Sequence, residues 1–112
     1  LSVKADAVMW LWSGILELTP EEQQQSICKV YENLKPNGLL IIESPYKTVK
    51  FVGELKQDQR VVVNTDWGRL EAYMPTEEEI RVYANKAGFS ELNMHHYKSI
   101  TGLDRVFYLL RK

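Results

Sequence analysis

Two short runs of apolar residues dominate the hydrophobic pattern of the chain. Residues 7–12 and 39–42 are apolar throughout, without the alternation of a half-exposed strand or the stripe of an amphipathic helix. Runs of this length are typical of strands that are buried on both faces. We therefore predict two such strands here, and each is much too short to span a membrane.

The polar stretch between the two runs carries the signals of a helix. Thr19 supplies an N-cap hydroxyl, Pro20 suits the first helical position, and Glu22 can complete a capping box. Residues 21–25 are all polar, so the first turns are expected to be exposed to solvent. Further along, apolar residues recur with helical spacing on one face: Ile27, Val30, Tyr31 and Leu34.

A turn of Lys35, Pro36, Asn37 and Gly38 ends this helix before the second strand. Proline cannot continue a helix, and asparagine or glycine accepts the positive φ that such a turn requires. A strand, a helix and a second buried strand form a βαβ unit, in which the strands run parallel with a right-handed crossover. The pattern therefore predicts an α/β fold.

An insertion with hairpin character follows the second strand. Pro45 and Tyr46 favour a loop directly after it. Residues 60–65 and 69–73 have the composition of short strands, and the residues between them form a tight turn that contains glycine. We therefore predict an inserted β-hairpin.

The last third of the chain predicts a helix and two paired strands. Thr76 and Glu79 repeat the capping-box spacing, and Gly88 ends the helix that begins there. Residues 89–97 alternate between apolar and polar positions, and residues 106–110 are apolar. Because the connection between these two strands is short, they can pair only as antiparallel neighbours.

Composition and charge narrow the class of protein. The chain has 112 residues, 45% of them hydrophobic, which fits one globular domain with a modest core. With 14 basic and 15 acidic residues and no block of like charge, nucleic acid is not an expected partner. The single cysteine, Cys28, excludes an internal disulfide and, with no targeting or membrane segment visible, favours a cytoplasmic location.

Three segments, in this order along the chain, carry a resemblance to a known fold family. They are residues 5–14, the turn Leu-Lys-Pro-Asn-Gly at residues 34–38, and the helix end Ala-Gly-Phe at residues 87–89. They resemble the fourth strand with its loop, the Leu-Lys-Pro-Gly-Gly turn and the helix before the sixth strand of class I, Rossmann-like S-adenosylmethionine-dependent methyltransferases. Asn37 tolerates the left-handed conformation of the glycine it replaces. The resemblance implies the C-terminal half of a doubly wound methyltransferase sheet.

The same resemblance marks what the chain lacks. In the family, a Gly-x-Gly-x-Gly loop and an acidic residue after the next strand hold the methionine and ribose parts of S-adenosylmethionine. Neither stands upstream of Asp6. We therefore expect residues 1–112 to form a single partial domain without the N-terminal cofactor-binding half. Alone, it is expected to bind S-adenosylmethionine weakly or not at all.

Ligands of open α/β sheets bind outside the carboxyl ends of the parallel strands, and this rule selects candidate site residues. Leu11, Trp12, Ser13 and Gly14 leave the first strand there, and the resemblance implies that their loop borders the cofactor and the substrate. Trp12 either walls off the transferred methyl group, as a substrate contact, or belongs to the core.

Four further residues are candidate substrate contacts. Glu43 and Tyr46 leave the second strand at the same end, where the Glu43 carboxylate is either a general base, a ligand for a substrate amine, or a solvated loop residue. Trp67 and Tyr73 lie in the hairpin, where the family often places substrate contacts. An exposed Trp67 is alternatively a contact for a protein partner.

Two functions remain open at this point. The first is the substrate-side portion of a methyltransferase acting on a small molecule, in which in-line displacement depends on positioning and requires no dedicated catalytic residue. The alternative is a non-catalytic Rossmann-like remnant that acts as a protein-interaction or self-associating module. Under either function, the 112-residue chain is expected to self-associate through the bare edge of strand 7–12. No metal site is expected, because His95 and His96 face opposite sides of a strand.

Overall fold

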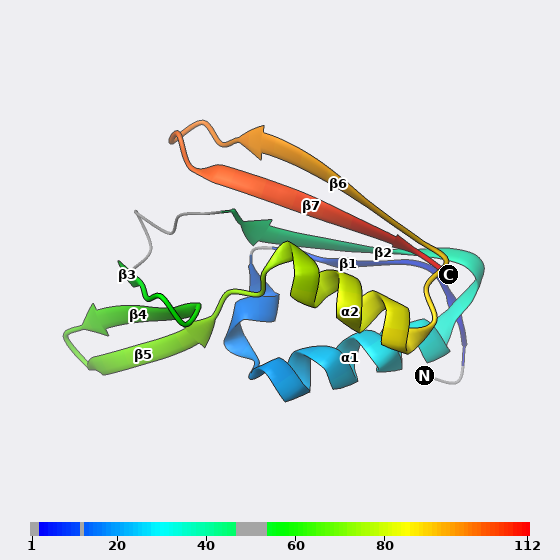
Figure 1. Ribbon diagram of the computed structural model, residues 1–112, viewed down its shortest axis with the longest axis horizontal. Helices are drawn as coiled ribbons and strands as arrows, with labels where there is room; N and C mark the ends of the chain where they lie inside the picture. Colours follow the sequence, from blue (N-terminus) through cyan, green and yellow to red (C-terminus); the bar gives the residue numbers. More distant parts are fainter. Residues whose placement is uncertain (1–2, 12, 47–53) are drawn as a thin grey trace.

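A four-stranded sheet forms the centre of the protein in a computed structural model, which describes residues 3–11, 13–46 and 54–112 (Figure 1). Its strands are β1 (Ala5–Trp10), β2 (Leu34–Pro45), β6 (Glu91–Lys98) and β7 (Asp104–Arg111), in the spatial order β1-β2-β7-β6. β1 runs parallel to β2, and β7 pairs antiparallel with both β2 and β6. The predicted α/β fold, with its parallel unit and final antiparallel pair, is therefore confirmed.

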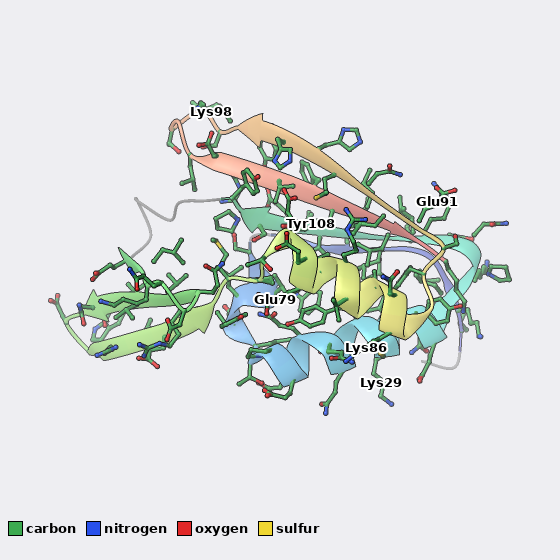
Figure 2. The ribbon with its side chains drawn as sticks, in the orientation of Figure 1. Lys29, Glu79, Lys86, Glu91, Lys98 and Tyr108 are labelled. Atoms are coloured by element: carbon green, nitrogen blue, oxygen red, sulfur yellow. The ribbon has the colours of Figure 1, made fainter. Side chains whose placement is uncertain are left out.

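Two helices, α1 (Pro20–Asn33) and α2 (Glu77–Ala87), pack side by side against one face of this sheet (Figure 1). Each begins at its predicted capping box, on Thr19 and on Thr76. Figure 2 shows Tyr108 pointing from β7 toward α2, while Lys29 and Lys86 point away from the sheet. Within the described residues, no helix is long and apolar enough to cross a membrane. The fully buried core between sheet and helices includes Ile27, Leu40, Ile42, Ile80, Val106 and Leu110.

The predicted turn at residues 35–38 lies within β2, which begins at Leu34 directly after α1 and shifts its register against β1 at these residues. Asn37 adopts a positive φ of 64°, as the turn requires. At Gly38 a Cβ atom would lie 2.8 Å from the carbonyl oxygen of Lys35, so no larger residue fits without a backbone shift. Asparagine therefore replaces glycine only at the position of the turn that has room for a side chain.

The face of the sheet opposite α1 and α2, which we call the open face, carries no helix in the described part of the chain. The prediction that β1 is buried on both faces is therefore wrong here, since Met9 is 67% exposed and Ala7 is exposed as well. Successive side chains of a strand point to opposite faces, so Ala7 and Met9 point away from the helices together with their β2 partners Leu39 and Ile41.

The insertion forms a second sheet, which extends away from the helices (Figure 1). It consists of β3 (Glu54–Leu55), β4 (Arg60–Thr65) and β5 (Gly68–Tyr73), all antiparallel. β4 and β5 form the predicted hairpin around Asp66 and Trp67. The short strand β3 is an addition that the sequence pattern does not predict.

We expect two glycines with similar backbone conformations to respond differently to alanine. Gly88, which caps α2 with a φ of 108°, would place a Cβ atom 3.1 Å from the Tyr31 ring, whereas Gly102, with a φ of 85°, has nothing within 4 Å of that position. Both substitutions lose the left-handed freedom of glycine, which costs about 1 kcal/mol. Gly88→Ala should lower the free energy of unfolding by a further ~1 kcal/mol in urea titrations, because Tyr31 must move. Equal losses would contradict the close packing of Gly88 on Tyr31.

Candidate functional site

A buried glutamine fixes the insertion against α1 and α2. Gln23 is fully buried, which corrects the prediction that the first turns of α1 are all exposed. Its Nε2 donates to the carbonyl oxygens of Ile15, Leu18 and Tyr73 at 3.0, 3.2 and 3.0 Å, and the Tyr83 hydroxyl donates to its Oε1 at 3.4 Å. A polar residue is tolerated at this buried helix position because its hydrogen bonds to the three carbonyls offset the cost of burying the amide.

Tyr73 and Tyr83 act as hydroxyl donors around this glutamine. Burial, reinforced by the Glu79 carboxylate that accepts the Tyr73 hydroxyl at 2.7 Å, raises the pKa of Tyr73. Burial also raises the pKa of Tyr83 to about 12. Both phenols therefore stay protonated at neutral pH, and Tyr73 is held beside α2 at the end of the hairpin.

At the carboxyl ends of β1 and β2, four polar side chains form a continuous set that we call the polar row: Ser13, Arg105, Glu43 and Tyr97. Arg105 Nη2 donates to Ser13 Oγ at 2.7 Å, and Arg105 Nε lies 3.4 Å from Glu43 Oε2. The Tyr97 hydroxyl donates to the same carboxylate. Burial, followed by this hydrogen bond to Glu43, raises the pKa of Tyr97.

Glu43 is part of β2, and its carboxylate is held in place. β2 continues through Pro45, which pairs with Arg105 of β7, so the prediction of a loop at Pro45 is wrong. Proline is tolerated there because the strand ends at this residue. The Glu43 and Arg105 side chains are each only 14% exposed. Glu43 is therefore not a solvated loop residue, whereas its role as a base stays a prediction.

The loop after β1 turns tightly at the predicted cofactor-binding residues. Ser13 adopts a positive φ of 58°, and the Gly14 amide donates to the carbonyl of Leu11 at 3.2 Å. At Gly14 a Cβ atom would lie 2.9 Å from the indole nitrogen of Trp10, so the backbone approaches that ring closely. Trp12 lies outside the described residues. The hydrogen bond from Arg105 to Ser13 thus ties this loop to the polar row.

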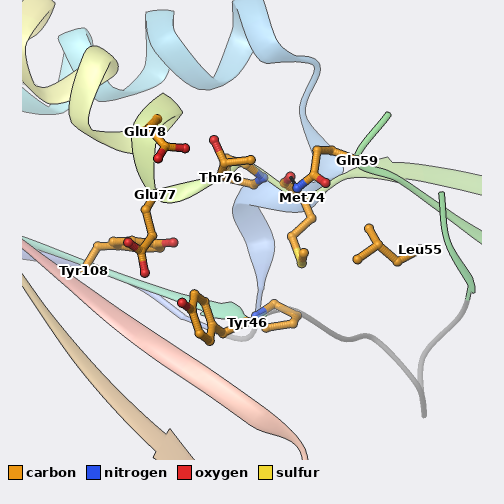
Figure 3. Close-up of a pocket in the computed structure, with 10 residues that line it drawn as sticks. Tyr46, Leu55, Gln59, Met74, Thr76, Glu77, Glu78 and Tyr108 are labelled. Carbon is orange, nitrogen blue, oxygen red and sulfur yellow. Dashed lines mark hydrogen bonds between the residues drawn. The ribbon is translucent and has the colours of Figure 1, made fainter. Parts of the chain in front are cut away.

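A hollow of about 360 Å³ opens at the end of β2, on the side of the sheet that faces α2 (Figure 3). We call it the tyrosine pocket. Figure 3 shows Met74 and Leu55 pointing from the insertion toward Tyr46, with Glu77 beside Tyr108. Its lining includes the side chains of Tyr46, Leu55, Met74, Glu77, Glu78 and Tyr108.

The structure separates the predicted substrate contacts. Tyr46 lines the tyrosine pocket, whereas Glu43 lies in the polar row. Tyr73 lies in the group formed by Gln23, Tyr73, Glu79 and Tyr83, which we call the Gln23 cluster. Trp67 is 92% exposed at the tip of the hairpin, and neither Tyr73 nor Trp67 lines the tyrosine pocket. The sequence did not single out Arg105, although the alternation of β7 would place it on the face of Glu43 once the strand register is known.

His95 and His96 lie on opposite faces of β6, as predicted. His95 pairs with Phe107 on the open face, whereas His96 Nε2 lies 3.7 Å from Glu77 Oε1. Among the described residues, no group of three or more histidine, cysteine, aspartate or glutamate side chains is placed to bind a metal ion.

Comparison with known proteins gives matches in structure and none in sequence. No protein family profile matches the chain. No curated protein matches its sequence. Solved structures that match it include an amino pentose methyltransferase from Micromonospora echinaspora involved in calicheamicin biosynthesis (TM-score 0.64, 21% identity), an S-adenosylmethionine-dependent methyltransferase from Clostridium acetobutylicum (0.67, 15%) and the CcbJ methyltransferase from Streptomyces caelestis (0.68, 16%).

These matches involve the whole chain but only part of each methyltransferase. They cover 100%, 99% and 98% of this chain, which spans 60%, 59% and 62% of the three proteins. At the level of the fold, the resemblance found in the sequence is confirmed. The chain has the fold of part of an S-adenosylmethionine-dependent methyltransferase.

Proposed function

We propose that this chain is the substrate-side portion of a methyltransferase that transfers a methyl group from S-adenosylmethionine to a small-molecule acceptor. The observation that carries this proposal is the likeness of the whole chain to about three fifths of three such enzymes. The loop at Ser13 and the tyrosine pocket also lie at the carboxyl ends of parallel strands, where open α/β sheets bind ligands.

The described residues fit one border of a cofactor site. The tight turn at Ser13 and Gly14 presents backbone at the end of β1, and Arg105 holds it in place. In the proposed enzyme, S-adenosylmethionine supplies a methyl group activated on a sulfonium sulfur. The residues of this chain contribute positioning, with Leu11 to Gly14 beside the cofactor and Trp12, Glu43, Tyr46, Trp67 and Tyr73 as candidate substrate contacts.

Calorimetric titration with S-adenosylmethionine tests whether the 112 residues alone are enough to bind the cofactor. We expect no measurable heat of binding with the 112-residue chain and clear binding with any longer form that its gene encodes. The longer form should transfer labelled methyl groups to a panel of small-molecule acceptors. Micromolar binding by the 112 residues alone would overturn the proposal that they are a partial domain. We propose a cytoplasmic location for the enzyme, because a chain with a single cysteine is compatible with a reducing compartment.

A second candidate function is self-association without catalysis. The observation that favours it is the position of β1 at the edge of the sheet, with its own Met9 side chain exposed. An unpaired strand edge is a template for pairing with another chain. Sedimentation of the 112-residue chain should then show dimers whose proportion grows with concentration, and a monomer at high concentration would exclude this candidate.

A further inference from the structure

We propose that the tyrosine pocket binds a small organic cation, a protonated amine carried on an apolar or aromatic body. Among the described residues that line it, the charged side chains are two carboxylates, Glu77 and Glu78. The remaining surface is largely tyrosine, methionine, leucine and proline. A hollow of this composition attracts positive charge and offers apolar area to the rest of the ligand.

The two carboxylates at the pocket differ from neighbouring glutamates that already have partners. Glu43, at the polar row, is already paired with Arg105. Glu79 is used by the capping box and by Tyr73. Glu77, in contrast, has a histidine at 3.7 Å, and no described lysine or arginine forms an ion pair with Glu77 or Glu78. A ligand cation can therefore supply the positive charge that these two side chains lack.

Acidic residues are also common in the first turn of a helix, where the helix dipole stabilises them. Glu21 occupies such a position in α1, on the exposed surface. Glu77 differs from it in its surroundings, because its side chain is only 34% exposed and its charge acts on the buried Tyr108 hydroxyl. The helix dipole alone therefore does not account for the place of Glu77 in a tyrosine-lined hollow.

The aromatic rings strengthen the case for a cation. The Tyr46 ring lines the pocket and packs against the His96 ring, with centroids 4.3 Å apart. An ammonium group over a tyrosine face is attracted by the ring quadrupole in addition to any nearby carboxylate. The volume, about 360 Å³, is at the lower end of the range for small-molecule sites and suits a compact amine. That this amine belongs to the methyl acceptor rests on the proposed function.

Binding is tested by NMR titration of the isotope-labelled chain with three probes of similar shape, without cofactor. Phenethylamine should shift the amides of Leu55, Met74 and Thr76, with phenethyl alcohol binding more weakly and phenylpropionate most weakly. Equal affinity for the amine and the alcohol, or shifts scattered away from the pocket, would overturn the proposal. Because no methyl transfer is measured, failure of the methyltransferase proposal would leave this result unaffected.

Variants then assign the selectivity to named groups. Glu77→Gln should raise the Kd for phenethylamine about three- to tenfold and leave phenethyl alcohol unchanged, because only the charged ligand loses an ionic partner. Glu21→Gln removes the same charge from the first turn of α1 and should change neither Kd. Tyr46→Leu should weaken binding of the amine, whereas Tyr46→Phe should retain it. If Glu77→Gln and Glu21→Gln have the same effect, the pocket does not select cations through Glu77.

Discussion

Gln23→Leu is expected to lower the free energy of unfolding by about 3 kcal/mol, because leucine keeps the volume of the side chain and removes its hydrogen bonds. The buried amide donates to the carbonyls of Ile15, Leu18 and Tyr73. The carbonyl of Ile15 keeps a second donor, the amide of Leu18, so the loss falls mainly on the other two oxygens and on the Tyr83 hydroxyl. Urea titration of the variant measures the effect.

Two further variants test whether the loss comes from the buried hydrogen bonds. One controls for the effect of leucine on the helix, and the other replaces the donor group by an acceptor. Gln25→Leu makes the same change on the exposed side of α1 and should alter stability by less than about 0.5 kcal/mol. Gln23→Glu keeps the shape but aims a carboxylate at three carbonyl oxygens, so it should destabilise at least as much as leucine at neutral pH. Similar losses for Gln23→Leu and Gln25→Leu would show that the Gln23 cluster does not hold the insertion in place.

Local signals in the sequence predicted the elements well, because each depends on a few adjacent residues. The capping boxes on Thr19 and Thr76 and the positive φ of Asn37 need no knowledge of the rest of the fold. The hairpin around Trp67 follows from turn chemistry in the same way. The antiparallel pairing of β6 with β7 follows from the short link between them.

The errors concern positions whose surroundings come from distant parts of the chain. The burial of Gln23 depends on the carbonyl of Tyr73, fifty positions later, and no periodicity within α1 indicates it. Met9 is apolar yet exposed. The sequence did not predict this exposure, because the hydrophobicity of a strand does not show whether other residues cover both of its faces. Glu43 is polar yet largely buried, because the register of β2 against β7 brings Arg105 beside it.

The candidate site was predictable in position but not in its contacts. The rule that ligands bind at the carboxyl ends of parallel strands led to Ser13, Glu43 and Tyr46. The structure places the first two in the polar row and the third in the tyrosine pocket. The rule could not supply the partners of these side chains, since Arg105, beside Ser13 and Glu43, and His96, beside Tyr46, belong to strands that follow much later in the sequence.

Arg105→Met should be the second most damaging change, with a loss of about 3 kcal/mol, because it removes the cation that lies beside the largely buried Glu43 carboxylate. The double variant Glu43→Gln/Arg105→Met should recover most of that loss. A double-mutant cycle measured by urea titration should therefore give a coupling energy above about 1 kcal/mol. The exposed pair of Lys98 and Asp104 joins β7 to its other neighbour, β6, and serves as the control, with an expected coupling below about 0.5 kcal/mol.

Arg105→Lys separates the effect of the positive charge from that of the hydrogen bond that Arg105 donates to Ser13 in the loop after β1. Lysine can still pair with Glu43, but a single ammonium cannot reproduce the fork that contacts Glu43 through Nε and Ser13 through Nη2. We expect Arg105→Lys to retain most of the stability that Arg105→Met loses, while amide hydrogen exchange at Gly14 becomes faster. Unchanged exchange at Gly14 would show that the turn is held by its own backbone and by Trp10, and that Arg105 contributes charge pairing alone. Faster exchange with retained stability would identify Arg105 as the residue that positions the proposed cofactor-binding loop.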